Sequence, residues 1–276
     1  MRYVMSLKKE MSVPRKKALL LAAFSVALAG SLSFDGMAVA QHSLKGSQVR
    51  TLPIAAALAD RDRPDTDRSR DATRKPAQLL AFAGLGPGMK IADLMPGQGY
   101  FTRIFSNVVG KTGHVYAVVP AERVARKPDA ADAVKAIAAD PSFANVSEVT
   151  TPLASPVLPA LVDMAWTSQN YHDVYGQSPD AALAFDKAVF GILRPGGTFI
   201  VIDHVAIAGS GSAPTTTLHR IDPALIRDQV TKAGFVFESE SSVLRNPADP
   251  HTATVFDPSI RGRTDQVVFK FRKPAR

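Results

Sequence analysis

The segment Met89-Lys90-Ile91-Ala92-Asp93-Leu94-Met95-Pro96-Gly97-Gln98-Gly99-Tyr100-Phe101 joins a short apolar run to a helical pattern through two glycines. The apolar run ends at the carboxylate of Asp93, and the glycines follow at alternate positions. This order predicts a strand, a tight turn and a helix. Glycine lets the backbone approach a ligand closely, and the first N–H groups of a helix point toward that ligand. The segment therefore predicts a nucleotide-type binding site.

Two common nucleotide loops do not fit this segment. A dinucleotide-binding loop has a third glycine where Thr102 stands, which disfavours NAD and FAD. A phosphate-binding loop continues with Gly-Lys-Ser or Gly-Lys-Thr, whereas Tyr100 follows Gly99 here. The alternative is that the glycines serve only the geometry of a strand-to-helix turn.

Apolar runs alternate with helical patterns along the rest of the chain. We expect strands at residues 89–94, 115–119, 146–149, 162–167 and 198–202, followed by an antiparallel pair at 235–243 and 266–271. Helices are expected at 77–83, from the glycine loop to Gly110, and at 129–139, 180–193 and 223–233, with Asp180 and Asp222 as N-caps. The pattern predicts one α/β domain over residues 75–276, with a mostly parallel sheet and an antiparallel end.

A second motif, Leu193-Arg194-Pro195-Gly196-Gly197, precedes the expected fifth strand. Together the two motifs resemble the class I S-adenosylmethionine-dependent methyltransferases, whose first motif is D-x-G-x-G-x-G and whose fifth strand follows an L-x-P-G-G turn. Asp93, Gly97 and Gly99 match the first motif, and Met95 replaces its first glycine.

The resemblance covers roughly residues 75–272 and is closest to a group of predicted methyltransferases with export signals. It implies a Rossmann-like methyltransferase fold with a seven-stranded sheet and helices on both faces. It also implies S-adenosylmethionine as the cofactor and methyl transfer to a small-molecule acceptor. A ligand-binding module without catalytic activity on the same fold is the alternative.

The resemblance implies a set of cofactor-binding residues around the glycine loop: Asp93, Pro96, Gly97, Gly99, Tyr100, Glu122 and Asn170. Methyltransferases usually end the second strand with an acid that holds the ribose, but this strand ends at Val119-Pro120. Either Glu122 reaches back from the following loop, or the ribose is held in another way, or the cofactor is not bound.

The loop Ser168-Gln169-Asn170-Tyr171-His172-Asp173 is the densest polar cluster in the sequence. In the resembled fold this loop faces the cofactor and the acceptor, so His172, Tyr171 and the more distant His219 are the expected catalytic residues. An imidazole titrates near neutral pH and could take the proton of the acceptor. A structural role for His172 is the alternative.

A metal site is not expected from the sequence. His172, Asp203, His204 and His219 are the residues that would form one, but no metal-binding spacing motif supports it. A hydrolase is not supported either, because the chain has no G-x-S-x-G motif.

Residues 1–40 carry the features of an export signal. Basic side chains precede an apolar run that starts at Ala18, and Ala38-Val39-Ala40 predicts cleavage after Ala40. We therefore expect a periplasmic or secreted protein that meets the membrane only through this signal. The segment contains six basic and two acidic residues, so its removal lowers the formal net charge from +8 to +4. With scattered charges and one Trp, the mature chain predicts no nucleic-acid partner.

Residues 41–74 form a polar extension before the domain. Alternating charges from Arg61 to Arg68 indicate a solvated loop. The alternative is a lid over the ligand pocket, with Arg63, Asp71 and Arg74 reaching inward. The chain has no cysteine, which excludes disulfides and a thiolate nucleophile. The oligomeric state does not follow from these features.

Overall fold

The structure is a computed structural model that describes residues 53–275 of the chain. The expected export signal, its cleavage site after Ala40 and the start of the polar extension lie outside the described residues. Within residues 53–275, no helix is both long and apolar enough to span a bilayer. The described part begins with a helical segment at residues 53–58.

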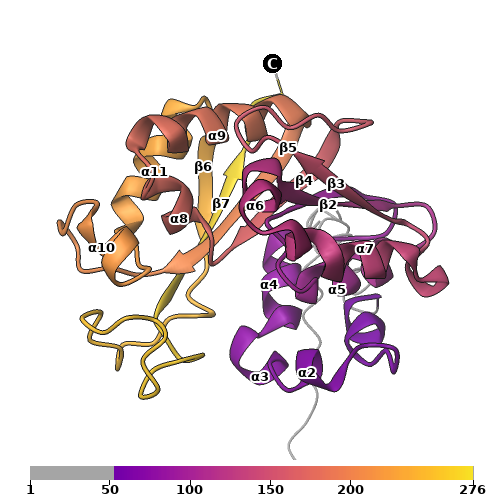
Figure 1. The fold of residues 1–276 in the computed structure, drawn as a ribbon, viewed down its shortest axis with the longest axis horizontal. Helices are drawn as coiled ribbons and strands as arrows, with labels where there is room; N and C mark the ends of the chain where they lie inside the picture. Colours follow the sequence, from indigo (N-terminus) through magenta and orange to yellow (C-terminus); the bar gives the residue numbers. More distant parts are fainter. Residues whose placement is uncertain (1–52, 276) are drawn as a thin grey trace, which may run out of the picture. The chain divides into compact units, whose positions relative to one another are not determined.

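The domain is built on a seven-stranded sheet with the strand order β3-β2-β1-β4-β5-β7-β6. Strands β1 to β5 run parallel, and β7 pairs in antiparallel fashion with both β5 and β6 (Figure 1). The expectation of a mostly parallel sheet with an antiparallel end is confirmed. The strands are β1 (Lys90–Leu94), β2 (His114–Pro120), β3 (Val146–Thr151), β4 (Val162–Ser168), β5 (Leu193–His204), β6 (Val236–Glu240) and β7 (Gln266–Arg272).

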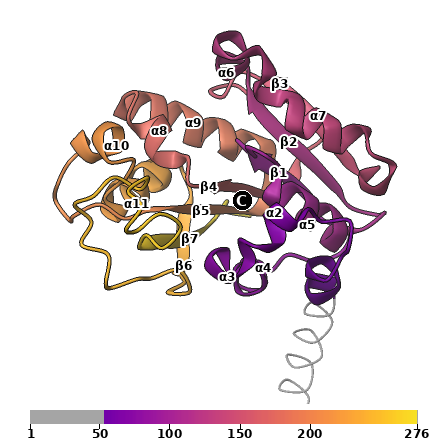
Figure 2. The same cartoon turned by 60° about the horizontal axis from the view of Figure 1, so that its bottom comes forward.

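Helices cover both faces of the sheet, because successive strand residues point to opposite sides. Ile91 belongs to a buried cluster with side chains of α4, α5 and α7, whereas Ala92 belongs to a second cluster with side chains of α8, α9 and α11. Figure 2 shows these helices around the sheet. The helices are α2 (Asp65–Arg68), α3 (Asp71–Arg74), α4 (Pro76–Ala83), α5 (Tyr100–Val109), α6 (Ala121–Arg126), α7 (Asp132–Ala139), α8 (Tyr171–Tyr175), α9 (Pro179–Ile192), α10 (Ala213–Thr217) and α11 (Pro223–Lys232).

Two helix starts show how well local signals predict boundaries. The side chain of Asp222 accepts a hydrogen bond from the Ala224 N–H at 2.9 Å, so the predicted cap of α11 is confirmed. The predicted cap of α9 is wrong, because Ser178 accepts from the Ala181 N–H at 3.0 Å. Asp180 instead lies in the first turn of that helix, where its negative charge interacts favourably with the helix dipole and stabilises the helix.

The parallel strands bring their carboxyl ends to one edge of the sheet. Leu94 at the end of β1 pairs with Val118 of β2 and Thr167 of β4, and Ser168 pairs with Ile202 of β5. Ligands of open α/β sheets bind beyond this edge. The connections from β1, β2, β4 and β5 therefore supply the candidate site.

Candidate active site at the carboxyl ends of the strands

Gly97 and Gly99 have different roles in the turn between β1 and α5. Both have left-handed backbone conformations, with φ angles of +60° and +77°. A Cβ on Gly99 would lie 2.2 Å from Cδ1 of Ile137 in α7, whereas a Cβ on Gly97 would meet no atom within 4 Å. A side chain at Gly99 would therefore have to displace the end of the Ile137 side chain, whereas Gly97 leaves open space where a ligand can approach the backbone.

Met95 occupies the position of the first glycine of the methyltransferase motif. Its φ of 57° is unusual for a residue with a side chain. Its backbone N–H donates to the carbonyl of Val118 at 2.9 Å, and its carbonyl accepts from Nδ2 of Asn170 at 3.2 Å. These bonds connect the glycine loop to the ends of β2 and β4 and hold the unusual conformation in place.

Asp93 is buried at the end of β1 with 3% of its surface exposed. One carboxylate oxygen accepts a hydrogen bond of 2.6 Å from the hydroxyl of Thr102, the residue that replaces the third glycine of a dinucleotide loop. Burial raises the pKa of Asp93 to about 7. Asp93 does not cap α5, because no side chain forms a cap there. It joins the strand to the helix instead.

A cavity of about 540 Å³ runs along the carboxyl ends of the strands. This volume is in the range of small-molecule sites. Residues at the ends of four strands form the wall: Met95 after β1, Pro120 at the end of β2 and Glu122 after it, Leu153 after β3, and Asn170 and Asp173 after β4. The cavity has the place and the size of a nucleoside site.

Glu122 lies close to the end of β2, where methyltransferases usually have the acid that binds the ribose. Val119 at the end of β2 is buried, and Glu122 in the first turn of α6 is the next acid along the chain. Its Oε1 accepts a hydrogen bond from the Leu153 N–H at 3.3 Å, across the cavity wall. The structure therefore places a carboxylate within the cavity after β2, although that carboxylate does not belong to the strand.

His172 is held by a buried carboxylate. Its Nδ1 lies 2.8 Å from Oδ1 of Asp203 at the end of β5, and its backbone N–H donates to Oδ2 at 2.7 Å. Burial by itself would lower the pKa of His172, but the carboxylate of Asp203 outweighs burial and raises it. The sequence does not predict this partner, because Asp203 lies 31 positions further along the chain.

The other ring nitrogen of His172 meets two further side chains. Nε2 lies 3.3 Å from Nδ1 of His219 and 3.3 Å from Oδ1 of Asp173. The structure thus brings His172 and His219 together, as the sequence analysis expects. The side chain of His204 is used elsewhere, because its Nδ1 contacts the hydroxyl of Thr264 at 2.7 Å.

Two tyrosines from the expected site do not face the cavity. The hydroxyl of Tyr171 donates to Oδ2 of Asp186 at 2.6 Å, and both residues are fully buried between α8 and α9. The hydroxyl of Tyr100 donates to Oδ1 of Asp71 at 2.6 Å. We therefore correct both predictions. A catalytic hydroxyl at Tyr171 and ligand binding by the Tyr100 side chain do not fit, because each hydroxyl is bound to a carboxylate in a packed region.

The segment before α4 packs against the start of α5, and Figure 1 shows α2 and α3 beside α4 and α5. Arg63 is 1% exposed and pairs with both oxygens of Asp71 at 2.9 and 2.7 Å. Asp71 also receives the Tyr100 hydroxyl. These side chains reach inward and cover the first turn of the helix that follows the glycine loop.

Arg74 is a residue that the sequence analysis left out of the cofactor-binding set. Its guanidinium lies over the rings of Tyr100 and Phe101, and Nη2 donates to Ser168 and Gln169 at 3.2 and 3.4 Å. Burial lowers its pKa to about 10, so the group stays charged at neutral pH. None of the carboxylates in residues 53–275 forms an ion pair with it. No sequence motif marks this residue, because only the fold brings it to the end of β4.

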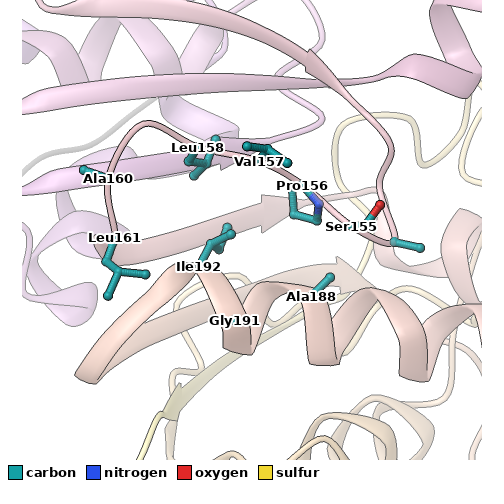
Figure 3. Close-up of a pocket in the computed structure, with 10 residues that line it drawn as sticks. Ser155, Pro156, Val157, Leu158, Ala160, Leu161, Ala188, Gly191 and Ile192 are labelled. Carbon is teal, nitrogen blue, oxygen red and sulfur yellow. The ribbon is translucent and has the colours of Figure 1, made fainter.

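A second cavity, of about 560 Å³, differs in chemistry. Figure 3 shows the loop of residues 154–161 beside the end of α9, with Leu158, Leu161 and Ile192 among the lining side chains. Ser155 contributes the one polar side chain of its lining. None of the residues that line this cavity has a titratable side chain.

Comparisons with known proteins give different results for the sequence and for the fold. The sequence matches no protein-family model and no curated protein. The structure is similar to a S-adenosylmethionine-dependent methyltransferase from Aquifex aeolicus, with a TM-score of 0.54 and 16% identity over 82% of this chain and 97% of that one. It is also similar to a methyltransferase from Mesorhizobium loti, with a TM-score of 0.51 and 16% identity over 74% of this chain and all of that one.

A third similar structure, the [4+2]-cyclase SpnF, has a TM-score of 0.54 and 16% identity, and the match covers 85% of this chain and 95% of SpnF. Identities this low show the fold alone. The chain therefore has the fold of the class I S-adenosylmethionine-dependent methyltransferases. Because the cyclase shares this fold, the reaction has to be argued from the site.

Proposed function

We propose that the protein binds S-adenosylmethionine in the 540 Å³ cavity and transfers its methyl group to a small-molecule acceptor. The observation that carries the proposal is the arrangement of this cavity. It lies beyond the carboxyl ends of the strands and is lined by Met95 of the glycine loop, and the cluster of His172, Asp173 and His219 adjoins it through Asp173. The arrangement suits a charged nucleoside on one side and an acceptor on the other.

Three groups of the chain suit three parts of the cofactor. The open backbone at Gly97 suits close approach of the ligand to the loop. The carboxylate of Glu122 can accept hydrogen bonds from the ribose hydroxyls. The guanidinium of Arg74, which reaches Ser168 at the end of β4 and has no carboxylate partner among residues 53–275, can pair with the carboxylate of the methionine part.

Methyl transfer needs alignment more than it needs a catalytic group. The acceptor attacks the methyl carbon, and the C–S bond breaks with its electron pair staying on sulfur, which gives S-adenosylhomocysteine. The acceptor also loses a proton if it carries one. Holding the two reactants in line supplies most of the rate enhancement, and His172, Asp173 and His219 are the polar groups placed to bind the acceptor.

One observation favours the second candidate, a binding module without methyl transfer. Val119 stands where the ribose acid of a methyltransferase belongs, and it is buried in the sheet. A fold that kept the cavity could hold another ligand there. The polar cluster at His172 favours the enzyme, because a binding pocket does not require paired imidazoles at its edge.

Calorimetric titration with S-adenosylhomocysteine and S-adenosylmethionine tests the proposal. We expect one molecule bound per chain, together with a rise in the melting temperature. Incubation with S-adenosylmethionine and pooled small hydroxyl and amine compounds then separates the two candidates, because an enzyme releases S-adenosylhomocysteine. Absence of heat and of any thermal shift at saturating ligand would refute binding and the enzyme with it.

A further inference from the structure

The cluster beside the cavity contains three atoms that can bind a metal ion. They are Nε2 of His172, Oδ1 of Asp173 and Nδ1 of His219. The two distances from Nε2 are 3.3 Å each, and the distance from Nδ1 of His219 to Oδ1 of Asp173 is 3.5 Å. We propose that this triangle is a binding site for a four-coordinate divalent ion of the zinc type.

The size of the triangle fits a tetrahedral ion. Zinc binds imidazole nitrogen and carboxylate oxygen at about 2.0–2.2 Å, and tetrahedral geometry then places neighbouring ligand atoms about 3.3–3.6 Å apart. An octahedral ion with bonds of about 2.0–2.1 Å would bring adjacent ligands to about 2.8–3.0 Å. The observed sides of 3.3, 3.3 and 3.5 Å match the tetrahedral edge.

The surroundings of His172 direct a lone pair at this triangle. Asp203 accepts hydrogen bonds from the backbone N–H groups of His172 and His204, at 2.7 Å each, and contacts Nδ1 of His172 at 2.8 Å. A carboxylate in this position keeps the proton on Nδ1 and leaves Nε2 free to bind a metal ion. Zinc proteins use the same arrangement, in which a carboxylate binds one ring nitrogen of a histidine and so orients the other nitrogen toward the ion.

The residues around the triangle also favour a cation. Nε2 of His172 and Nδ1 of His219 each present a lone pair in one of the two neutral tautomers of the ring, and both face Oδ1 of Asp173. Such an arrangement is stable only with a proton or a metal ion among them. Three protein ligands leave the fourth position of a tetrahedral ion open, as in catalytic zinc sites.

The open fourth position of the ion indicates which class of acceptor could bind there. This part of the inference rests on the proposed function. Asp173 also lines the cavity, so the ion and the cofactor would be neighbours. A metal-bound hydroxyl loses its proton to water more easily. The resulting oxygen attacks the methyl carbon, the C–O bond forms, the C–S bond breaks, and the ion keeps its oxidation state. An alcohol or phenol is therefore the acceptor that suits this site.

Titration of the purified, chelator-treated protein with Zn²⁺ alone tests the site, and Co²⁺ reports the geometry through the intense visible absorption of its four-coordinate form. We expect one ion per chain. His219→Ala and Asp173→Asn should each weaken binding at least about 100-fold, because even changes beyond the ligands cost about 10- to 100-fold. His114→Ala, at the opposite end of β2, should bind as the wild type does.

The outcomes separate this inference from the proposed function. No saturable binding, or binding that His219→Ala and Asp173→Asn leave unchanged, would overturn the metal site. The same preparation is titrated with S-adenosylhomocysteine. If Zn²⁺ binds at the triangle and the nucleoside does not, the metal site stands and its role in methyl transfer fails. If only the nucleoside binds, the proposed function stands and the metal site fails.

Discussion

Replacing Gly97 with alanine is expected to weaken binding of S-adenosylhomocysteine at least about tenfold while the protein stays folded. The added Cβ would meet no protein atom within 4 Å, so it enters the space that the ligand would occupy. Gly196, in the turn before the core of β5, provides a matched control. Its φ of +74° is also left-handed, and its Cβ would also meet no atom within 4 Å.

The two substitutions should cost the same stability for the same reason. A residue with a side chain in the left-handed region costs about 1–2 kcal/mol relative to glycine. For a domain of this size each kcal/mol lowers the melting temperature by about 2–4 °C. Gly97→Ala and Gly196→Ala should therefore melt about 2–8 °C below the wild type.

Binding should distinguish the two variants. Gly97→Ala should lose at least about tenfold in affinity, which is about 1.4 kcal/mol, whereas Gly196→Ala should keep the affinity of the wild type. Calorimetric titration measures the affinity, and thermal melts without ligand measure the stability. Wild-type affinity in both variants would refute a ligand position at this loop. Equal loss in both would show a general effect of backbone strain.

Three further changes test other groups of the site. The folded-state pKa of Asp93, about 7, lies above its usual value of 3.8, so Asp93 destabilises the folded protein as the pH rises from about 4 to 7. Between about pH 5 and about pH 8, Asp93→Asn should therefore gain about 2–3 kcal/mol in the free energy of unfolding over the wild type, measured by urea unfolding, and parallel pH profiles would contradict the buried carboxyl. Arg74→Met should weaken binding of S-adenosylhomocysteine at least about tenfold, because the charge-assisted bond to the ligand's carboxylate is lost. Binding of adenosine, which has no carboxylate, should be unchanged, and an equal effect on both ligands would exclude this contact. Glu122→Gln should lower the affinity for the nucleoside about tenfold, whereas Glu148→Gln, outside the cavity, should leave it unchanged. If calorimetry finds the same affinity in both variants, Glu122 does not bind the ribose.

The elements of the fold could be predicted because their signals are local. The apolar run before Asp93, the glycines after it and the helical spacing that follows lie in one short segment, and the structure has β1 and α5 at these places. The Asp222-Pro223 start of α11 is equally local. Alternation of strand and helix then leads to parallel pairing, since each helix returns the chain to the same end of the sheet.

The partners of the site residues could not be predicted in this way. Nothing near Tyr171 in the sequence indicates that its hydroxyl binds Asp186, and nothing near His172 indicates Asp203 at the end of another strand. Each of these contacts joins residues that are distant in the chain. Their geometry depends on how α8 and α9 pack against the sheet.

By itself, the sequence determined the class of fold and the position of the site at the strand ends, because periodicity and turn chemistry act over a few neighbouring residues. The tertiary structure decided which side chains meet there. It brought His219 to His172 and Asp173, directed Tyr171 into the core, and placed Arg74 without a carboxylate partner among residues 53–275. Side-chain direction at the end of a strand is set by packing against distant segments, and that information is not contained in any local stretch.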